Sequence, residues 1–419
     1  MDVVRIIPAP SPLCGTLTLP GSKSITNRAL LLAALAPGSK PVRLSGMLES
    51  DDTRHMVKAL RAWGVQITQG SSNDEVKLVS PPTFQPPPAP IDVGNAGTAM
   101  RFLTAAAALV PGVITLTGDR YMRRRPIGAL AEALAQWGIK TRTEDGCPPI
   151  TIDGSGTLAS ASITVQADLS SQFVSALLMV APRAEGPVDI LVPADIPAQG
   201  YVDLTVQMMA AFGVAPVRTE SGYRVQGRYH APESYAIEPD ASTATYFWAA
   251  QALTKGHITL SGKGATMGDL QPDAASRALI ERFPDFPERI DGAQMQDAVP
   301  TLAVMAAFVP RPVRFVGISN LRVKECDRIA VLRRELQRVQ PDLAHEEGDA
   351  LVIKGDPHLA PHAPETMIDP EGDHRMAMAL ALLGLRCEGI TITEPDCVSK
   401  TFPGYWQALA QVGARLQRG

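Results

Sequence analysis

Six segments of the chain place small hydrogen-bond donors, in most cases with a Lys or Arg, beside a strongly apolar stretch. The first, LPGSKSITNRALLLAAL (19–35), carries Lys23 and Arg28. The others read GNAGTAMRFLTAAAAL, RRRPIGAL, DLSSQFVSALLM, NLRVKECDRIAVL and GDHRMAMALALL. Ser, Asn and Gly are typical of helix N-termini, where backbone N–H groups and the helix dipole attract anions. Because capping alone needs no cation, the segments predict a small, multiply charged anionic ligand where several helices begin.

The overall composition limits what that ligand can be. The net charge is −4 at pH 7, which argues against a broad basic surface for nucleic acid. The PGSKS segment lacks the glycine that a P-loop places directly before its lysine. The seven histidines are scattered and the five cysteines form no C-x-x-C pair, so we expect reduced thiols and no metal site.

The chain also lacks the marks of a membrane or exported protein. No apolar run reaches the roughly 18 residues of a membrane span. The first residues, MDVVRIIPAPSPLCG, are typical of neither a signal peptide nor a transit peptide. We therefore expect a cytoplasmic protein with no membrane partner.

The helices predicted around these segments recur at regular intervals along the chain. Three amphipathic stretches (52–68, 125–142 and 201–218) each end in an aromatic residue and a glycine, and these glycines lie 74 and 75 residues apart. Glycine is the usual left-handed residue after a helix. The last stretch, YWQALAQVGARLQ, repeats the pattern, and AASRALIERFPDF and RIAVLRRELQRVQPDL stop at proline instead. With β-rich runs such as VITLTG and VRFVG between them, these helices predict six similar α/β units. We expect PPTFQPPPAP (81–90) to be an extended surface loop within a domain.

Eight motifs, in order from residue 19 to residue 406, are LPGSKSITNRALLLAALA, SDDTRHM, GNAGTAMRF, RPIGAL, SSQFVSALLM, RVKECDRI, GDHRMAMA and KTFPGYW. This set closely resembles the 5-enolpyruvylshikimate-3-phosphate synthases. The resemblance implies transfer of the enolpyruvyl group of phosphoenolpyruvate to the 5-hydroxyl of shikimate 3-phosphate, with release of phosphate, in aromatic amino acid (chorismate) biosynthesis. It implies no metal or organic cofactor. The implied fold is α/β, with two similar lobes of three βαβαββ units each (an inside-out α/β barrel), one lobe being 21–240 and the other 1–20 plus 241–419.

The resemblance also implies which residues meet the two phosphorylated substrates. Those expected to bind shikimate 3-phosphate are Lys23, Ser24, Arg28, Ser170, Ser171, Gln172, Asp297, Asn320 and Lys324. Those expected to bind phosphoenolpyruvate are Lys23, Gly97, Arg125, Gln172, Arg328, Arg375 and Lys400. Lys23 would serve both anions.

The same resemblance implies catalytic roles. Asp297 would take the proton of the 5-hydroxyl, and Glu325 would protonate C3 and later remove a C3 proton. The residues expected to stabilise the departing phosphate are Lys23, Lys400 and His374. Two simpler interpretations stay open: Asp297 could cap a helix, and Glu325 could be an ion-pair partner of Arg328 at i,i+3.

Two positions depart from the family's usual pattern. Ala198 stands where many members have a serine that contacts the substrate phosphate, although Tyr201 is kept. Phe102 stands where proline is frequent, directly after Arg101. In this family the herbicide glyphosate competes with phosphoenolpyruvate; Gly97 leaves room for it, so we expect ordinary sensitivity.

Three other functions compete with 5-enolpyruvylshikimate-3-phosphate synthase activity as interpretations of the sequence. The sister transferase that acts on UDP-N-acetylglucosamine generally carries a reactive cysteine before its R-P motif, whereas here the loop reads GDRYMRRRPIG and the nearest cysteine is Cys147. An RNA-terminal phosphate cyclase would need a nucleotide-accepting histidine near the C-terminus and a more basic surface. A non-enzymatic anion sensor would not need Asp297, Glu325 and Lys23. We expect a monomer that binds small molecules and no nucleic acid.

Overall fold

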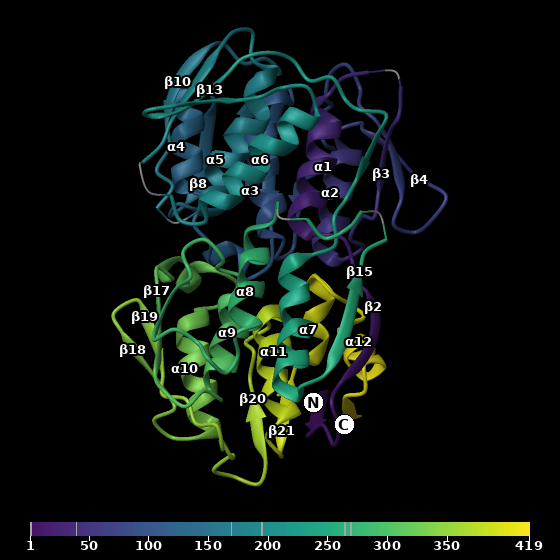
Figure 1. Cartoon of the computed structure of the whole chain (residues 1–419). Coiled ribbons are helices and arrows are strands. Elements are labelled where there is room, and N and C mark those ends of the chain that lie inside the picture. Colours follow the sequence, from purple (N-terminus) through teal and green to yellow (C-terminus); the bar gives the residue numbers. More distant parts are fainter. Residues whose placement is uncertain (1, 39, 169, 194–195, 264, 269) are drawn as a thin grey trace. The chain divides into compact units, whose positions relative to one another are not determined.

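The chain forms two compact units. The computed structural model describes residues 2–38, 40–168, 170–193, 196–263, 265–268 and 270–419. One unit comprises Gly21–Glu238, and the other comprises Met1–Pro20 together with Pro239–Gly419. The chain therefore passes between the units after residues 20 and 238, where the sequence analysis has 20 and 240. Figure 1 shows both units as mixtures of helices and small sheets.

The unit Gly21–Glu238 contains, in its described part, three four-stranded sheets with one pairing pattern. The first two strands in each sheet order are parallel and the remaining pairs are antiparallel. The sheets are β14(Ser234–Ala236)-β3(Val42–Ser45)-β5(Val76–Val79)-β4(Gln66–Gln69), β6(Ile91–Asp92)-β7(Gly112–Thr117)-β9(Cys147–Gly154)-β8(Lys140–Glu144) and β10(Ala161–Thr164)-β11(Val188–Leu191)-β13(Gly222–Val225)-β12(Val217–Thr219).

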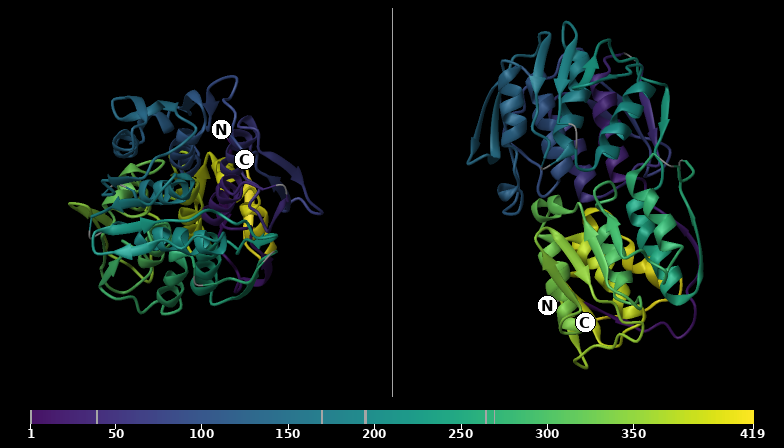
Figure 2. Two further views of the ribbon diagram at one scale, coloured as in Figure 1. Left: turned by 90° about the horizontal axis from the view of Figure 1, so that it is seen from above. Right: turned by 60° about the vertical axis from the view of Figure 1, so that its left-hand side comes forward.

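The second unit repeats the pattern in two of its sheets. These are β16(Arg289–Asp291)-β17(Val313–Val316)-β19(Ala350–Ile353)-β18(Ala344–Glu347) and β20(Thr366–Ile368)-β21(Ile390–Thr393)-β1(Val3–Ile7)-β22(Arg415–Arg418). The third described sheet is a parallel pair, β15(His257–Ser261) with β2(Cys14–Thr18). The two chain ends lie side by side, as Figure 2 shows, because β1 pairs antiparallel with β22.

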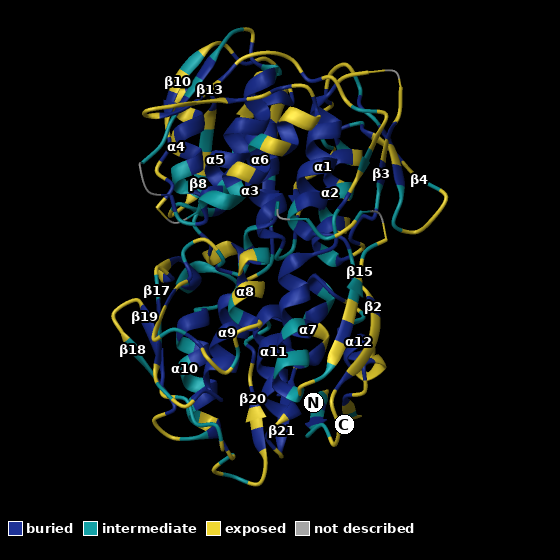
Figure 3. Ribbon diagram, viewed as in Figure 1, coloured by how far each residue is buried: buried dark blue, intermediate teal, exposed yellow. Residues whose placement is uncertain are grey.

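Each unit holds two kinds of helix. Buried helices are α1(Lys23–Leu35), α3(Gly97–Ala106) and α5(Ser171–Val180) in one unit, and α7(Ala241–Thr254), α9(Val299–Ala306) and α11(His374–Ala381) in the other. The amphipathic ones are α2(Asp51–Ala62), α4(Gly128–Gln136), α6(Gln199–Ala211), α8(Ser276–Ile280), α10(Arg328–Val339) and α12(Tyr405–Gln411). A helix that is apolar on every side must be covered, and Figure 3 shows α9 and α11 almost wholly buried. None of the described helices is long and apolar enough to cross a membrane.

The predicted helix ends are confirmed. Gly64, Gly138, Gly213 and Gly413 follow α2, α4, α6 and α12 with φ of +90°, +82°, +89° and +106°, the left-handed conformation that glycine adopts without strain. Two local predictions were less accurate. Pro126 does not open a helix, because α4 begins two residues later at Gly128. The stretch AASRALIERFPDF gives only the five-residue α8, preceded by a 3₁₀ turn at Pro272–Ala275.

The proline-rich segment 81–90 has no helix or strand, as predicted. One aromatic residue within it anchors it to the unit. Phe84 is buried against Trp63, with ring centroids 5.7 Å apart, and the Gln85 N–H donates to the Trp63 carbonyl at 3.0 Å. The loop therefore lies over the end of α2 and does not separate two domains.

The cap at Gly138 gives a test of the fold. A Cβ at Gly138 would meet no other atom within 4 Å, so Gly138→Ala introduces backbone strain without a clash. We expect it to lower the free energy of unfolding by about 1 kcal/mol, measured by urea denaturation, and Gly138→Asn to cost less. Gly38→Ala, which also meets no atom and is not left-handed, is the control. Equal stability of Gly138→Ala and Gly38→Ala would contradict the cap.

Candidate functional site

In the unit Gly21–Glu238, the N-terminal halves of three buried helices lie together. The Gln172 side chain on α5 donates to Thr98 Oγ1 on α3 at 3.3 Å. The Arg28 guanidinium on α1 donates to Ser175 Oγ on α5 at 3.3 Å. Backbone N–H groups at the starts of α1, α3 and α5 therefore point to one region, where they favour an anion.

Lys23 is the first residue of α1. The helix is capped by Ser22, whose side chain accepts from the Ile25 N–H at 3.4 Å. The buried Lys23 ammonium lies 3.3 Å from Asp52 Oδ2, and Asp52 is also buried. This acidic partner fixes the position of the lysine at the helix start.

Arg28 lies one turn further along α1 and is almost fully buried. Its Nε donates to Thr205 Oγ1 at 2.7 Å and its Nη1 to the Ser24 carbonyl at 3.0 Å. Its Nη2 donates to Ser175 Oγ and, at 3.1 Å, to the Tyr201 carbonyl. Burial lowers the pKa of Arg28 to about 10, so the guanidinium keeps its charge at neutral pH.

Gly97 begins α3 directly beside Arg125. A Cβ at Gly97 would lie 2.5 Å from Arg125 Nη1, and the same nitrogen is 3.5 Å from Asn95 Oδ1. Arg101 donates to the Gly97 carbonyl at 3.2 Å and to the Pro126 carbonyl at 3.0 Å. Arg101 thus ties α3 to the segment that carries Arg125, and only a glycine leaves space for that guanidinium.

The start of α5 supplies further small donors. Ser170 caps the helix and accepts from the Gln172 N–H at 3.2 Å, and Ser171 is the buried first residue. Nearby, Ala198 precedes α6 with a left-handed backbone (φ 56°) and is buried. Its methyl group offers no hydroxyl to a ligand.

In the second unit, Arg328 is the centre of an ion-pair network. Its Nη1 lies 2.9 Å from Asp297 Oδ1, its Nη2 2.9 Å from Glu325 Oε2 and its Nε 2.7 Å from Asp373 Oδ2. Burial acts to lower the pKa of Arg328, but the three carboxylates outweigh it and hold the pKa above its ordinary value. Three separate chain segments are thereby held by one side chain.

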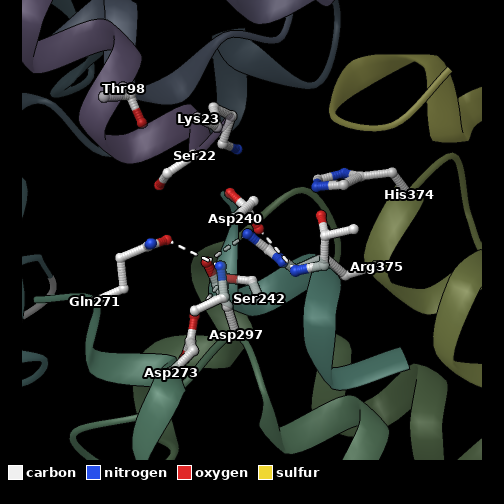
Figure 4. Close-up of polar contacts among 12 residues, drawn as sticks. Ser22, Lys23, Thr98, Asp240, Ser242, Gln271, Asp273, Asp297, His374 and Arg375 are labelled. Atoms are coloured by element: carbon white, nitrogen blue, oxygen red, sulfur yellow. Dashed lines mark hydrogen bonds and ion pairs between the residues drawn. The ribbon is translucent and has the colours of Figure 1, made fainter. Parts of the chain in front are cut away.

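Two more cations join this network. Lys400 Nζ lies 2.5 Å from Glu325 Oε1, and Arg375 Nη2 lies 2.8 Å from Asp297 Oδ2. Burial again opposes the charge of Arg375, while Asp297, Tyr246, Asp240 and Asp273 raise its pKa above the ordinary value. Figure 4 shows Arg375 reaching toward Asp240 and Asp297.

The remaining predicted residues of this unit lie around the same network. Asp373 caps α11, and the fully buried His374 has its Nδ1 3.5 Å from Asp373 Oδ1. Asn320 is buried and donates to the side chain of Gln296, the neighbour of Asp297. Lys324 directly precedes Glu325 and is half-buried. No group of three or more metal-ligating side chains is found in the described ranges.

The structure tests the two simpler interpretations of Asp297 and Glu325, as a helix cap and as an ion-pair partner. Asp297 does not cap α9, which begins at Val299 after Ala298, so that interpretation is wrong. Glu325 does pair with Arg328, and it pairs with Lys400 as well.

Sequence reasoning assigned no role to two buried acids that hold the predicted cations. Asp52 stands in the quoted SDDTRHM motif, and Asp373 heads GDHRMAMA. A helix-capping position next to predicted cations was the available signal for Asp373. Thr205, which accepts from Arg28, gave no signal, because nothing local in α6 distinguishes it.

Comparison with known proteins identifies the family. The model of the EPSP synthase family (3-phosphoshikimate 1-carboxyvinyltransferase) matches residues 7–409. The 3-phosphoshikimate 1-carboxyvinyltransferase of Rhizobium leguminosarum is 53% identical over 99% of this chain and 98% of its own length. That of Pseudomonas savastanoi is 51% identical over 99% of each. The chain belongs to the EPSP synthase family.

Solved structures show that the fold is that of the enolpyruvyl transferases. An EPSP synthase from Acinetobacter baumannii matches with a TM-score of 0.81 at 24% identity over the whole of both chains. The enolpyruvyl transferase NikO of Streptomyces tendae matches with a TM-score of 0.74 at 18% identity, over 100% of this chain and 99% of its own. The predicted α/β fold, with two similar lobes of βαβαββ units, is confirmed. NikO shares this fold, so the fold alone does not distinguish one enolpyruvyl transferase from another. The assignment to the EPSP synthase family rests on the family model and on the relatives at about 50% identity.

The network around Arg328 predicts a large stability effect. Asp373→Asn keeps a side-chain oxygen at the helix cap but removes the negative charge beside a fully buried guanidinium. We expect the free energy of unfolding to fall by about 3 kcal/mol, measured by urea denaturation. Asp285→Asn, at an exposed acid that pairs with Arg311, should change it by less than about 0.5 kcal/mol. Similar losses for both variants would show that Asp373 is not essential to the network.

Proposed function

We propose that the residues described above carry out the reaction of this family. In that reaction the 5-hydroxyl oxygen of shikimate 3-phosphate attacks C2 of phosphoenolpyruvate while C3 gains a proton. A C3 proton is then lost and phosphate leaves, which gives the enolpyruvyl product. The observation that carries the proposal is the network in which Asp297 and Glu325, the two acids expected to move protons, are both held by Arg328.

Shikimate 3-phosphate is assigned to groups that suit an anion with several oxygens. In this proposal Lys23, Ser24 and Arg28 bind it from α1. The start of α5 binds its phosphate through Ser170, Ser171 and Gln172, as a helix N-terminus favours. Asn320 and Lys324 lie near it, and Ala198 leaves one family hydrogen bond to be supplied by another group.

Phosphoenolpyruvate is assigned to a group of residues that contains more Lys and Arg side chains than the group assigned to shikimate 3-phosphate. Its phosphate and carboxylate would meet Lys23, Arg125, Arg328, Arg375 and Lys400, with Gly97 and Gln172 completing the site. Arginine presents a planar fork of N–H donors that matches carboxylate and phosphate geometry. Arg328 and Arg375 stay protonated at neutral pH because neighbouring carboxylates raise their pKa values.

Burial distinguishes the roles of the three carboxylates around Arg328. The side chain of Asp297 is 19% exposed, that of Glu325 7% and that of Asp373 0%. We assign Asp297 as the base that takes the 5-hydroxyl proton, because a substrate oxygen can reach it. Glu325, beside Lys400, transfers protons at C3, while Asp373 positions Arg328. Lys23, Lys400 and His374 stabilise the departing phosphate.

The proposal includes three properties of the whole chain. The reaction as written uses no metal or organic cofactor. The substrates are small molecules, and the net charge of −4 gives no reason to expect nucleic acid as a partner. We place the protein in the cytoplasm. We expect it to be a monomer, and sedimentation in solution would test that oligomeric state.

The reaction itself gives the first test. We expect phosphate release from shikimate 3-phosphate with phosphoenolpyruvate, and none when UDP-N-acetylglucosamine replaces the shikimate. Asp297→Asn and Glu325→Gln should each lower kcat by at least about a hundredfold, whereas Glu281→Gln, at an exposed ion pair with Arg277, should not. Activity only with the sugar nucleotide, or with neither acceptor, would overturn the proposal.

The contact between Gly97 and Arg125 gives a second test. In Gly97→Ala the new methyl group must displace the Arg125 guanidinium, so we expect a higher KM for phosphoenolpyruvate. Inhibition by glyphosate should weaken by on the order of tenfold or more, the usual effect of one added methyl group in a tight pocket. Gly128→Ala is the matched control, because Gly128 also begins a helix and its Cβ would make only ordinary contacts. Unchanged glyphosate inhibition in Gly97→Ala would contradict the pocket assignment.

A further inference from the structure

The guanidinium of Arg28 lies over the aromatic ring of Phe102. Arg28 Cζ is 5.0 Å from the centroid of the Phe102 ring, within the range of a cation–π interaction. Phe102 lies on α3 and is completely buried. The ring of Tyr201, on α6, is also close, at 5.9 Å.

Arg28 is held without being neutralised. The four acceptors that it contacts are the hydroxyls of Thr205 and Ser175 and the carbonyls of Ser24 and Tyr201, all of them uncharged. No carboxylate pairs with it anywhere in the part of the chain that the structure describes. Arg328 is the opposite case, with three carboxylates around it. A buried cation with only neutral neighbours keeps its full attraction for an incoming anion.

The hydrogen bonds also limit how Arg28 can meet a ligand. A guanidinium has five N–H groups. Within the described ranges, one at Nε, one at Nη1 and both at Nη2 have acceptors. The second N–H of Nη1 has no protein acceptor in these ranges; if it binds a ligand, the direction of that bond depends on how the guanidinium plane is held. The Phe102 ring, with its centroid 5.0 Å from Arg28 Cζ, is close enough to limit how the guanidinium can move.

We propose that Phe102 is a positioning residue for substrate binding, whose ring stabilises the charge of Arg28 and orients its remaining N–H toward an anionic group of shikimate 3-phosphate. The proposal rests on the assignment of Arg28 to that substrate. Burial lowers the pKa of Arg28, and an aromatic face at this distance attracts a cation without adding negative charge. Since Phe102 shares α3 with Gly97, the contact also links the helix assigned to phosphoenolpyruvate with the arginine assigned to the acceptor substrate.

A purely packing role for Phe102 makes a different prediction. A ring that only fills space would affect stability when altered, and it would affect both substrates to a similar degree. A ring that acts on the charge of Arg28 would affect shikimate 3-phosphate more than phosphoenolpyruvate. It would respond to the electron density of the ring even when the shape of the ring is kept.

Fluorinated phenylalanines separate these roles, because fluorine withdraws electron density from the ring face with little change in size. We expect the KM for shikimate 3-phosphate to rise progressively from 4-fluorophenylalanine to 3,4,5-trifluorophenylalanine at position 102, to on the order of tenfold. The KM for phosphoenolpyruvate and kcat should change by less than about twofold. The same analogues at Phe212 are the control, since that buried ring packs against Tyr235 and not against a cation. Equal effects at positions 102 and 212 would overturn the proposal.

Arg28→Lys distinguishes failure of this inference from failure of the function it rests on. Lysine keeps the charge but loses the planar face, so the KM for shikimate 3-phosphate should rise in this variant. If it rises while the fluorinated series has no effect, the stacking proposal falls and the assignment of Arg28 stands. If Arg28→Lys leaves that KM unchanged, the assignment of Arg28 falls and the inference falls with it.

Discussion

The need to keep cations charged inside a protein shapes both units. A guanidinium removed from water loses its solvation, and only nearby negative charge or well-placed acceptors can compensate. Arg328 is compensated by acids from three segments, at Asp297, Glu325 and Asp373. Those contacts fix the start of α10, the cap of α11 and the approach to α9 relative to one another. The site residues of this unit are therefore positioned by the same interactions that stabilise their charges.

The apolar helices are the second part of the same arrangement. Because α1, α3 and α5 are buried along nearly their whole length, polar groups within them, such as Arg28 and Ser175, need partners in neighbouring helices. Small residues such as Ser22, Gly97 and Ser170 keep those ends open, while the amphipathic helices and sheets cover the sides. A core that excludes water raises the strength of each electrostatic contact at its margin.

Local sequence predicted what depends on neighbours along the chain and missed what depends on distant ones. Glycine caps were predictable, since a left-handed glycine acts within a few positions, whereas the start of α4 lies two residues beyond the predicted Pro126. The partners of the cations were not. Asp373 reaches Arg328 across 45 residues and Thr205 reaches Arg28 across 177, and hydrophobic periodicity carries no information on such pairs. The shortness of α8 was also missed: a 3₁₀ turn at Pro272–Ala275 precedes it, and only five α-helical residues follow.

The contrast between Arg28 and Arg328 indicates how one fold supports two kinds of chemistry. Around Arg328 stand three carboxylates, of which Asp297 is the most accessible, and the proposal assigns proton transfer to Asp297 and Glu325. Around Arg28, the acceptors are hydroxyls and carbonyls that cannot take a proton at neutral pH, which suits the binding of an anion that must stay intact. Lys23 lies between these cases, since a buried acid, Asp52, pairs with its ammonium. In the proposed function, the charge of the groups that surround each arginine therefore distinguishes the one assigned to anion binding from the one that holds the proton-transferring acids.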